Sequence, residues 1–186
     1  MIYSAGLAFA MLWGVSFFEL HMSLVQASFC ASFFSWGIVI GLSLFGWACG
    51  RVAGPLPLLA LGALVTGLSV AVILYGPATY LVFALGMFFC GIANGSYALA
   101  FVVVGSSVPR QYTGAAFGFA NMAILAVGGL LFQPVIGILA RMRGLDVPDA
   151  GSLSVLIWAQ VVALLLLLPL ARLSREEPPA SDLKTA

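Results

Sequence analysis

Charged residues are scarce in this sequence: only 7% of its 186 residues are Asp, Glu, Lys or Arg, while 63% are hydrophobic. Soluble domains carry about 25% charged residues. A soluble fold of this length has too small an interior to enclose so much apolar surface. The net charge of +1, without a basic tract, also argues against a nucleic-acid partner. The composition therefore predicts an all-α integral membrane protein whose main partner is the lipid bilayer.

Cysteine and histidine are also scarce, with three copies and one copy. Cys30, Cys49 and Cys90 lie in apolar runs without a CxxC spacing, which favours buried thiols that act as small hydrophobic residues. The sequence contains no phosphate-binding loop, dinucleotide fingerprint, HExxH motif or Ser-His-Asp arrangement. We therefore expect no metal, no cofactor and no enzymatic activity.

Long apolar runs dominate the sequence. About 20 apolar residues suffice for a helix to cross a bilayer, and six runs meet this length: residues 3–22, 27–49, 56–75, 79–104, 113–140 and 153–172. No basic segment precedes the first run, so it is predicted to be a span and not a cleaved signal peptide. Residues 1–173 are predicted to form the membrane domain, and residues 174–186 a disordered cytoplasmic tail.

The basic residues predict the orientation in the membrane. Five of them follow even-numbered runs: Arg51, Arg110, Arg172, Arg175 and Lys184. Two lie on the opposite side, Arg141 and Arg143. Because cytoplasmic loops are enriched in Lys and Arg, both chain termini are predicted to lie in the cytoplasm.

Glycines recur four residues apart, a spacing that places small residues on one helix face and lets two helix backbones approach closely. The pairs are Gly37/Gly41, Gly46/Gly50, Gly91/Gly95 and Gly114/Gly118. We expect them to be packing positions between helices. The sixth run is rich in leucine, and we expect it to be peripheral and to face lipid.

The fifth run contains two amides and a proline, Asn121, Gln133 and Pro134. Proline leaves a backbone carbonyl without its helical partner, so a kink is predicted at Gln133-Pro134. Because the amides accompany glycine and proline, we interpret all three residues as structural.

Three segments contain motifs of a known family. Residues 41–51 read GLSLFGWACGR, residues 108–122 read VPRQYTGAAFGFANM and residues 128–137 read GGLLFQPVIG. The first resembles the family's loop motif G-W-[LS]-[AS]-D-R-x-G-R-R. The second resembles its turn into helix eleven, and the third the continuation G-G-x-x-x-Q-P-[LIV]-[LIV]-G. Together they resemble the C-terminal six-helix half of a major facilitator superfamily (MFS) transporter, over residues 13–172.

The loop motif departs from the family pattern. Gly46 and Arg51 match it, but Gly50 stands where the family has an aspartate, and residues 53–56 lack the basic residues that follow. The resemblance implies that this charge cluster latches the outward-open state. The latch is therefore expected to be weakened in this chain.

The resemblance implies two inverted three-helix repeats and secondary active transport of a small solute by alternating access in a bacterial inner membrane. The family fold contains two six-helix halves, and this sequence supplies one. The second half is expected from the same polypeptide, a separate chain or another copy. The alternative function is a non-transporting subunit or assembly factor of a larger membrane complex, built on a degenerate half.

Glu19 is the strongest candidate for a functional side chain, because an ionisable group within a membrane span suggests a functional role. It is a candidate for binding a proton or a substrate cation. The competing interpretation places Glu19 in water at the external interface. His21 lies on a different helix face and is a second candidate for proton coupling, or another interfacial residue.

The first and fourth runs are expected to line the solute cavity, because they are equivalent in the inverted repeats. Asn94 and Tyr97 lie three residues apart on one helix face. They are candidates for hydrogen bonding to the solute or, alternatively, for joining helices. Trp13 and Phe17 are candidates for the cavity wall, although aromatic residues in membrane proteins more often serve as core or interface positions.

Overall fold

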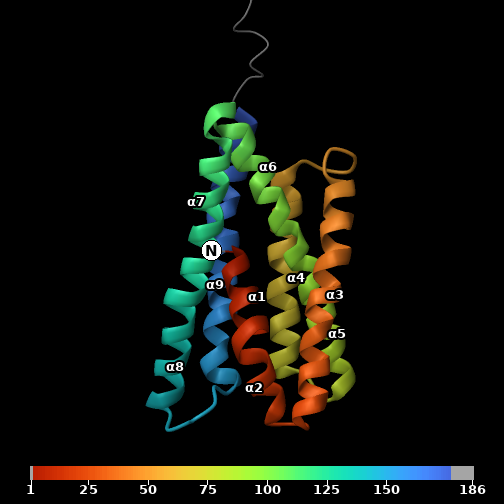
Figure 1. Ribbon diagram of the computed structural model, residues 1–186, viewed down its shortest axis with the longest axis vertical. Coiled ribbons are helices and arrows are strands. Elements are labelled where there is room, and N and C mark those ends of the chain that lie inside the picture. The colour runs from red at the N-terminus through yellow and green to blue at the C-terminus, as the bar shows by residue number, and fades with distance from the viewer. Residues whose placement is uncertain (1, 177–186) are drawn as a thin grey trace, which may run out of the picture.

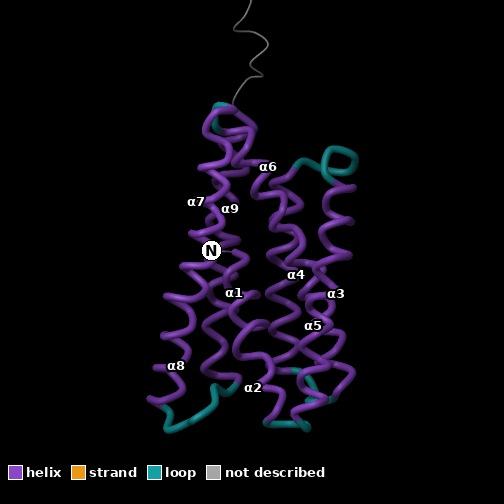
Figure 2. Tube along the Cα trace, viewed as in Figure 1, coloured by secondary structure: helices purple, strands orange, loops and turns teal. Residues whose placement is uncertain are grey.

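The computed structural model describes residues 2–176, and this part of the chain is a helical bundle (Figure 1 and Figure 2). The elements are α1 (Ile2–Ala8), η1 (Phe9–Trp13), α2 (Gly14–Glu19), α3 (Leu24–Ala48), α4 (Pro55–Tyr75), α5 (Tyr80–Asn94), η2 (Gly95–Tyr97), α6 (Ala98–Ser107), η3 (Arg110–Tyr112), α7 (Thr113–Ala126), η4 (Val127–Phe132), α8 (Gln133–Met142) and α9 (Ala150–Glu176). The all-α prediction is therefore confirmed for the described residues.

These elements join into helical segments that run up and down the bundle (Figure 1). In chain order, the described segments are residues 2–19, 24–48, 55–75, 80–107, 110–142 and 150–176, called the first to the sixth below. The turn at residues 49–54 lies at the same end as residues 108–112, and the turns at residues 20–23, 76–79 and 143–149 lie at the other. Figure 1 also places the N-terminus partway along the bundle.

Among the described residues, four segments are long and apolar enough to cross a membrane: Leu24–Ala48, Pro55–Tyr75, Tyr80–Ser107 and Arg110–Met142. Ser4–Glu19 and Ala150–Leu166 are apolar but shorter. The helix α9 continues to Glu176, past the predicted end at residue 172; residues 177–186 of the predicted tail lie outside the described part of the chain.

Local sequence explains where the helices begin. Ser23 and Gln26 form a capping box at the start of α3, in which each side chain bonds the backbone N–H of the other residue. Thr79 caps α5 by accepting from the N–H of Val82. Pro55 occupies the first turn of α4, where its missing N–H removes no helical hydrogen bond.

Glycines bring α3 and α5 into backbone contact. A Cβ atom at Gly37 would overlap the carbonyl oxygen of Phe88, and one at Gly41 would overlap that of Ile92. On α5, Gly91 meets α3 in the same way, and so does Gly95. The predicted packing role of Gly37/Gly41 and Gly91/Gly95 thus has a direct basis, since the two pairs pack against each other.

The other glycine pairs face open space. Gly46, Gly50, Gly114 and Gly118 have no atom within 4 Å of a Cβ position. The helix α7, which carries Gly114 and Gly118, has no buried residue. Packing between described helices therefore does not account for these two pairs.

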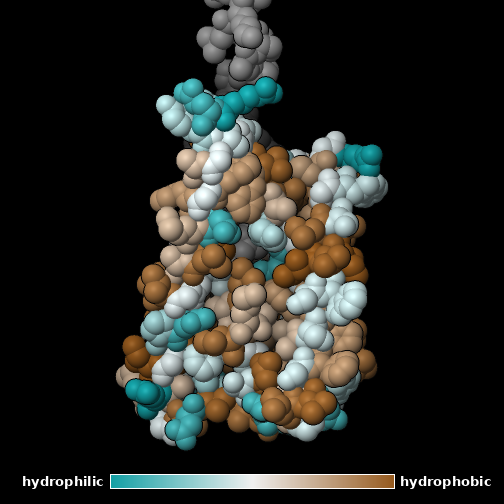
Figure 3. Space-filling view, in the orientation of Figure 1, coloured by the Kyte–Doolittle hydropathy of each residue, from teal (hydrophilic) through white to brown (hydrophobic). Residues whose placement is uncertain are grey.

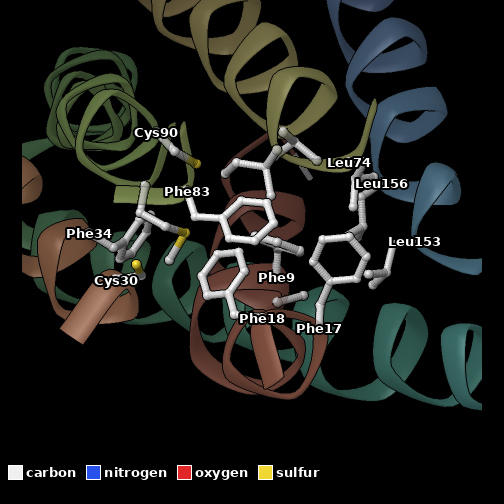
Figure 4. Close-up of a cluster of buried hydrophobic side chains, with 14 of the residues drawn as sticks. Phe9, Phe17, Phe18, Cys30, Phe34, Leu74, Phe83, Cys90, Leu153 and Leu156 are labelled. Carbon is white, nitrogen blue, oxygen red and sulfur yellow. The ribbon is translucent and has the colours of Figure 1, made fainter. Parts of the chain in front are cut away.

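A cluster of aromatic side chains packs the first segment (residues 2–19) against α5 in the fourth segment (Figure 4). The rings of Phe18 and Phe83 stack with centroids 4.6 Å apart, and Phe17 meets Phe83 edge-on at 6.1 Å. Phe9 contacts Phe18 at 6.1 Å. All are buried, so ring contacts join η1 and α2 to α5 within this part of the core.

The expectation that the sixth run faces lipid describes only one face of α9, where Trp158, Val162, Leu165 and Leu166 are exposed; the other face packs inside the bundle. The helix α9 packs on α4, and Leu153, Leu156, Gln160 and Ala163 are buried. Leucine surrounds the helix, so the sequence does not single out the face that packs. The Gln160 Nε2 donates a hydrogen bond to the carbonyl oxygen of Ala63 at 3.3 Å, which joins the two helices.

Three of the long segments contain turns that are not α-helical. The first is π-helical over Phe9–Trp13, the fourth is 3₁₀ over Gly95–Tyr97, and the fifth is π-helical over Val127–Phe132. The last lies directly before Gln133 and Pro134, where a distortion was predicted. Such interruptions occur often at functional sites.

Candidate functional site

A cavity of about 420 Å³ lies where the first segment meets α8 and the following loop. It is lined by Trp13, Pro134, Gly137, Ile138, Ala140, Arg141, Leu145, Asp146 and Pro148. The π-helical turn places Trp13 in its wall. Of the residues predicted to bind solute, Trp13 therefore does line a cavity, together with Pro134, which was interpreted as structural.

The cavity wall contains one cation and one anion, Arg141 and Asp146. Both are exposed. The neighbouring residues Arg143 and Asp149, by contrast, form an ion pair, with Arg143 Nη1 3.1 Å from Asp149 Oδ2. Among the described residues no ion pair involves Arg141 or Asp146. The site thus presents two opposite charges that are not bound to each other, at an end of the bundle where hydrophilic residues gather (Figure 3).

Asp149 holds the start of α9 beside this cavity. Its Oδ1 accepts hydrogen bonds from the Ser152 N–H at 2.8 Å and the Ser152 hydroxyl at 2.7 Å. These bonds, aided by Arg143, hold the pKa of Asp149 below its ordinary value of 3.8, while desolvation opposes them. The carboxylate therefore acts as a helix N-cap in its charged form.

Asp149→Ala should lower the free energy of unfolding by about 1 kcal/mol at neutral pH, because the N-cap is lost. The folded-state pKa is lowered, so the carboxylate stabilises fully above its unfolded pKa, and this stabilisation is lost as pH falls through the folded value. Thermal unfolding in detergent, compared for both proteins from neutral to acidic pH, checks this. A difference that does not shrink as the pH falls through the acidic range would contradict the capping assignment.

Asn94 lies inside the bundle and not in the cavity. It is 1% exposed. Its Nδ2 lies 3.3 Å from the Thr66 hydroxyl on α4 and 3.1 Å from the carbonyl oxygen of Cys90. A Cβ atom at Gly6 of α1 would overlap the same amide. Asn94 therefore sits where three helices meet, and its buried Oδ1 has no partner among the described atoms.

Glu19 and His21 lie at the end of the first segment. Glu19 is the last residue of α2, His21 lies in the following turn, and both are exposed. The His21 ring contacts Phe17 at a centroid distance of 5.5 Å and Phe83 at 5.8 Å. The structure does not bring these residues together with Asn94.

The remaining candidates are dispersed. Phe17 belongs to the buried aromatic cluster. Tyr97 is half-buried and its ring lies 6.0 Å from that of Phe101. Asn121 is exposed on α7, and Gln133 is half-buried at the start of α8.

Several buried polar groups were not predicted from the sequence. Gln160 is 2% exposed, and Ser4 donates its hydroxyl to the carbonyl oxygen of Ile124 at 3.0 Å. Thr66 was missed as the partner of Asn94. Gln160 could have been noticed, because it is an amide in a run of aliphatic residues. Ser and Thr gave no such signal, since their hydroxyls also bond within their own helix.

The turn that follows α3 explains one departure from the family loop motif. Gly50 has φ +83°, in the left-handed region that favours glycine. Its N–H donates to the carbonyl oxygen of Ala53 at 3.1 Å. Arg51 lies 5.7 Å from the centre of the exposed Trp47 ring. A side chain at position 50 is therefore strained even though the space around it is open.

Gly50→Asp, which restores the family residue, should lower stability by about 1 kcal/mol, because an L-residue is strained in this conformation. Gly54→Asp is the matched control: Gly54 caps α4 with φ −69°, and aspartate is a favourable N-cap. Thermal unfolding of the two variants should therefore shift in different directions. Equal midpoints would show that the turn relaxes.

Among the described residues, no group of three His, Cys, Asp or Glu side chains is placed to hold a metal ion.

The long apolar helices and their exposed hydrophobic side chains define an integral membrane protein of the helical-bundle class. The sequence profile of the Major Facilitator Superfamily matches residues 1–186, and the chain belongs to that family of transporters. No curated protein and no solved structure matches the chain significantly.

Proposed function

We propose that this chain forms one six-helix half of a secondary transporter that moves a small solute across a bacterial inner membrane by alternating access. The family match over the whole sequence is the observation that carries this proposal. In such transporters, one half rocks against the other around a site near the middle of the bilayer. The chain then needs a second half, from the same polypeptide, a separate chain or another copy.

In this proposal residues 1–173 form the membrane domain, and the shorter first and last segments also cross the bilayer. The first three segments and the last three form two inverted repeats. The interruptions η1 and η2 support this equivalence, because each lies within the first segment of its repeat. Both termini face the cytoplasm, which the excess of basic residues beside even-numbered segments supports.

The open face of α7 supports a second half. Gly114 and Gly118 have no atom within 4 Å of a Cβ position, and Asn121 is exposed on the same helix, three residues after Gly118. An amide is unfavourable in lipid unless protein or a wet cavity receives it. The structural interpretation of Asn121 then means that it contacts the second half.

Glu19, the last residue of α2, is the proposed coupling residue, and His21 in the following turn is the second candidate. Glu19→Gln removes the titratable proton while it keeps the side-chain size. Proton-driven uptake into proteoliposomes should fall by about a hundredfold or more, the low end of typical acid–base contributions, because the glutamine side chain cannot take up and release the proton. Counterflow without a proton gradient should persist. Unchanged proton-driven uptake would remove Glu19 from the mechanism.

A non-transporting subunit of a larger membrane complex is the second candidate, favoured by Gly50 in place of the motif aspartate. Purification from native membranes separates the two functions. Co-purification with a six-helix half and solute uptake after reconstitution supports transport. Co-purification with a large complex, without uptake by the reconstituted material, supports the subunit.

A further inference from the structure

We propose that the cavity beside Trp13 binds a small zwitterionic solute, of the α-amino acid class, between Arg141 and Asp146. The proposed function specifies neither the solute nor the residues that bind it. The zwitterion site is tested by equilibrium binding, so it can fail while transport stands, and transport can fail while binding stands.

The charges carry the argument. Arg141 and Asp146 line one cavity and have no ion pair among the described residues, whereas Arg143 and Asp149 bind each other. A simple anion is attracted by Arg141 and repelled by Asp146, and a simple cation meets the reverse, so neither gains much. A solute with both charges satisfies both groups at once.

The chemistry of the lining side chains favours an amino acid. A guanidinium presents parallel N–H donors that match a carboxylate, and a carboxylate accepts hydrogen bonds from an ammonium group. The rest of the wall includes Trp13, Ile138 and Leu145, which are apolar or aromatic. A volume of about 420 Å³ lies near the lower end of the range for small-molecule sites. The cavity therefore suits a single amino acid with an apolar side chain.

The test uses calorimetric titration of the full chain in detergent with L-leucine and two analogues that carry one charge each. L-leucinamide keeps the ammonium group, and 4-methylpentanoate keeps the carboxylate. We expect leucine to bind and each analogue to bind at least about tenfold more weakly, because each loses one charge-assisted contact. No binding of leucine with a Kd below about 10 mM overturns the proposal, and so does equal binding of all three.

Substitutions assign each charge to its partner. Arg141→Gln should abolish the preference for leucine over leucinamide, and Asp146→Asn should abolish the preference over 4-methylpentanoate. Arg143→Gln is the matched control and should leave all three affinities unchanged, because Arg143 is paired with Asp149. Preferences that survive in both of the first two variants place the ligand elsewhere and overturn the proposal.

A second kind of variant tests the cavity without altering a charge. Gly137 lines it and has nothing within 4 Å of a Cβ position, so the first atom of the leucine side chain in Gly137→Leu meets open space. The new side chain fills part of the cavity. We expect the affinity for leucine to fall at least about tenfold while the thermal unfolding midpoint stays the same. An unchanged affinity in this folded variant overturns the proposal.

Discussion

Gly41→Ala should strongly destabilise the protein, with a loss at the upper end of the range of about 1–3 kcal/mol for overpacked sites. The added methyl group overlaps the carbonyl oxygen of Ile92, a backbone atom that no side-chain rotation can move. The helices α3 and α5 must separate, and the adjacent contacts of Gly37 and Gly91 then loosen. Thermal unfolding and the yield of monodisperse protein in mild detergent measure the effect.

Gly46→Ala is the matched control on the same helix. Gly46 lies five residues further along α3 and has no atom within 4 Å of its Cβ position. Alanine is intrinsically favoured over glycine in a helix by up to about 1 kcal/mol. The two identical substitutions should therefore act in opposite directions. If both variants were destabilised equally, the effect of Gly41→Ala would not come from the close approach of α3 and α5.

Phe83→Ala should produce the other large loss of stability, about 3–5 kcal/mol by analogy with buried phenylalanines in soluble proteins. Phe83 is 1% exposed and stacks on Phe18 while it also contacts Phe17 and His21. Truncation leaves a void between the first and fourth segments, and the surrounding rings lose their packing partners. Reversible unfolding by denaturing detergent would measure the change.

Phe89→Ala controls for the loss of a phenyl ring as such. Phe89 lies on the same helix but is 51% exposed. When its ring is removed, lipid or detergent fills the space, and no buried void forms. The stability of this variant should stay within about 0.5 kcal/mol of the original protein, as is usual for exposed sites. A similar loss in both variants would mean that the aromatic cluster does not fasten the two segments together.

The positions of the helical segments were accessible from the sequence, because their causes are local. The run at residues 56–75 corresponds to Pro55–Tyr75, and its ends coincide with Pro55 and Gly76-Pro77. The run at residues 27–49 corresponds to Leu24–Ala48, whose start is fixed by the Ser23 capping box. Apolar length and breakers sufficed for the first of these helices, whereas the start of the second lies before the predicted residue 27, because its apolar run does not reveal the Ser23 cap.

The candidate site was predicted only in part. Trp13 lines a cavity, but Arg141 in the same wall was interpreted only as a marker of the orientation in the membrane. Glycine pairs with identical spacing have different surroundings, since Gly37 and Gly41 are packed while Gly114 and Gly118 are open. Spacing along one helix does not specify which other helix lies opposite.

The sequence by itself determined that this is an all-helical membrane chain of a transporter family, since hydropathy, turn residues and motifs are properties of neighbouring positions. Only the tertiary structure decided that α9 is packed through Gln160, that Asn94 meets Thr66 and that Arg141 shares a cavity with Asp146. The physical reason is that, on a uniformly apolar helix, the side chains do not indicate which face packs against other helices and which faces lipid. Their partners are chosen by how all helices pack together, across separations such as the 97 residues between Ala63 and Gln160.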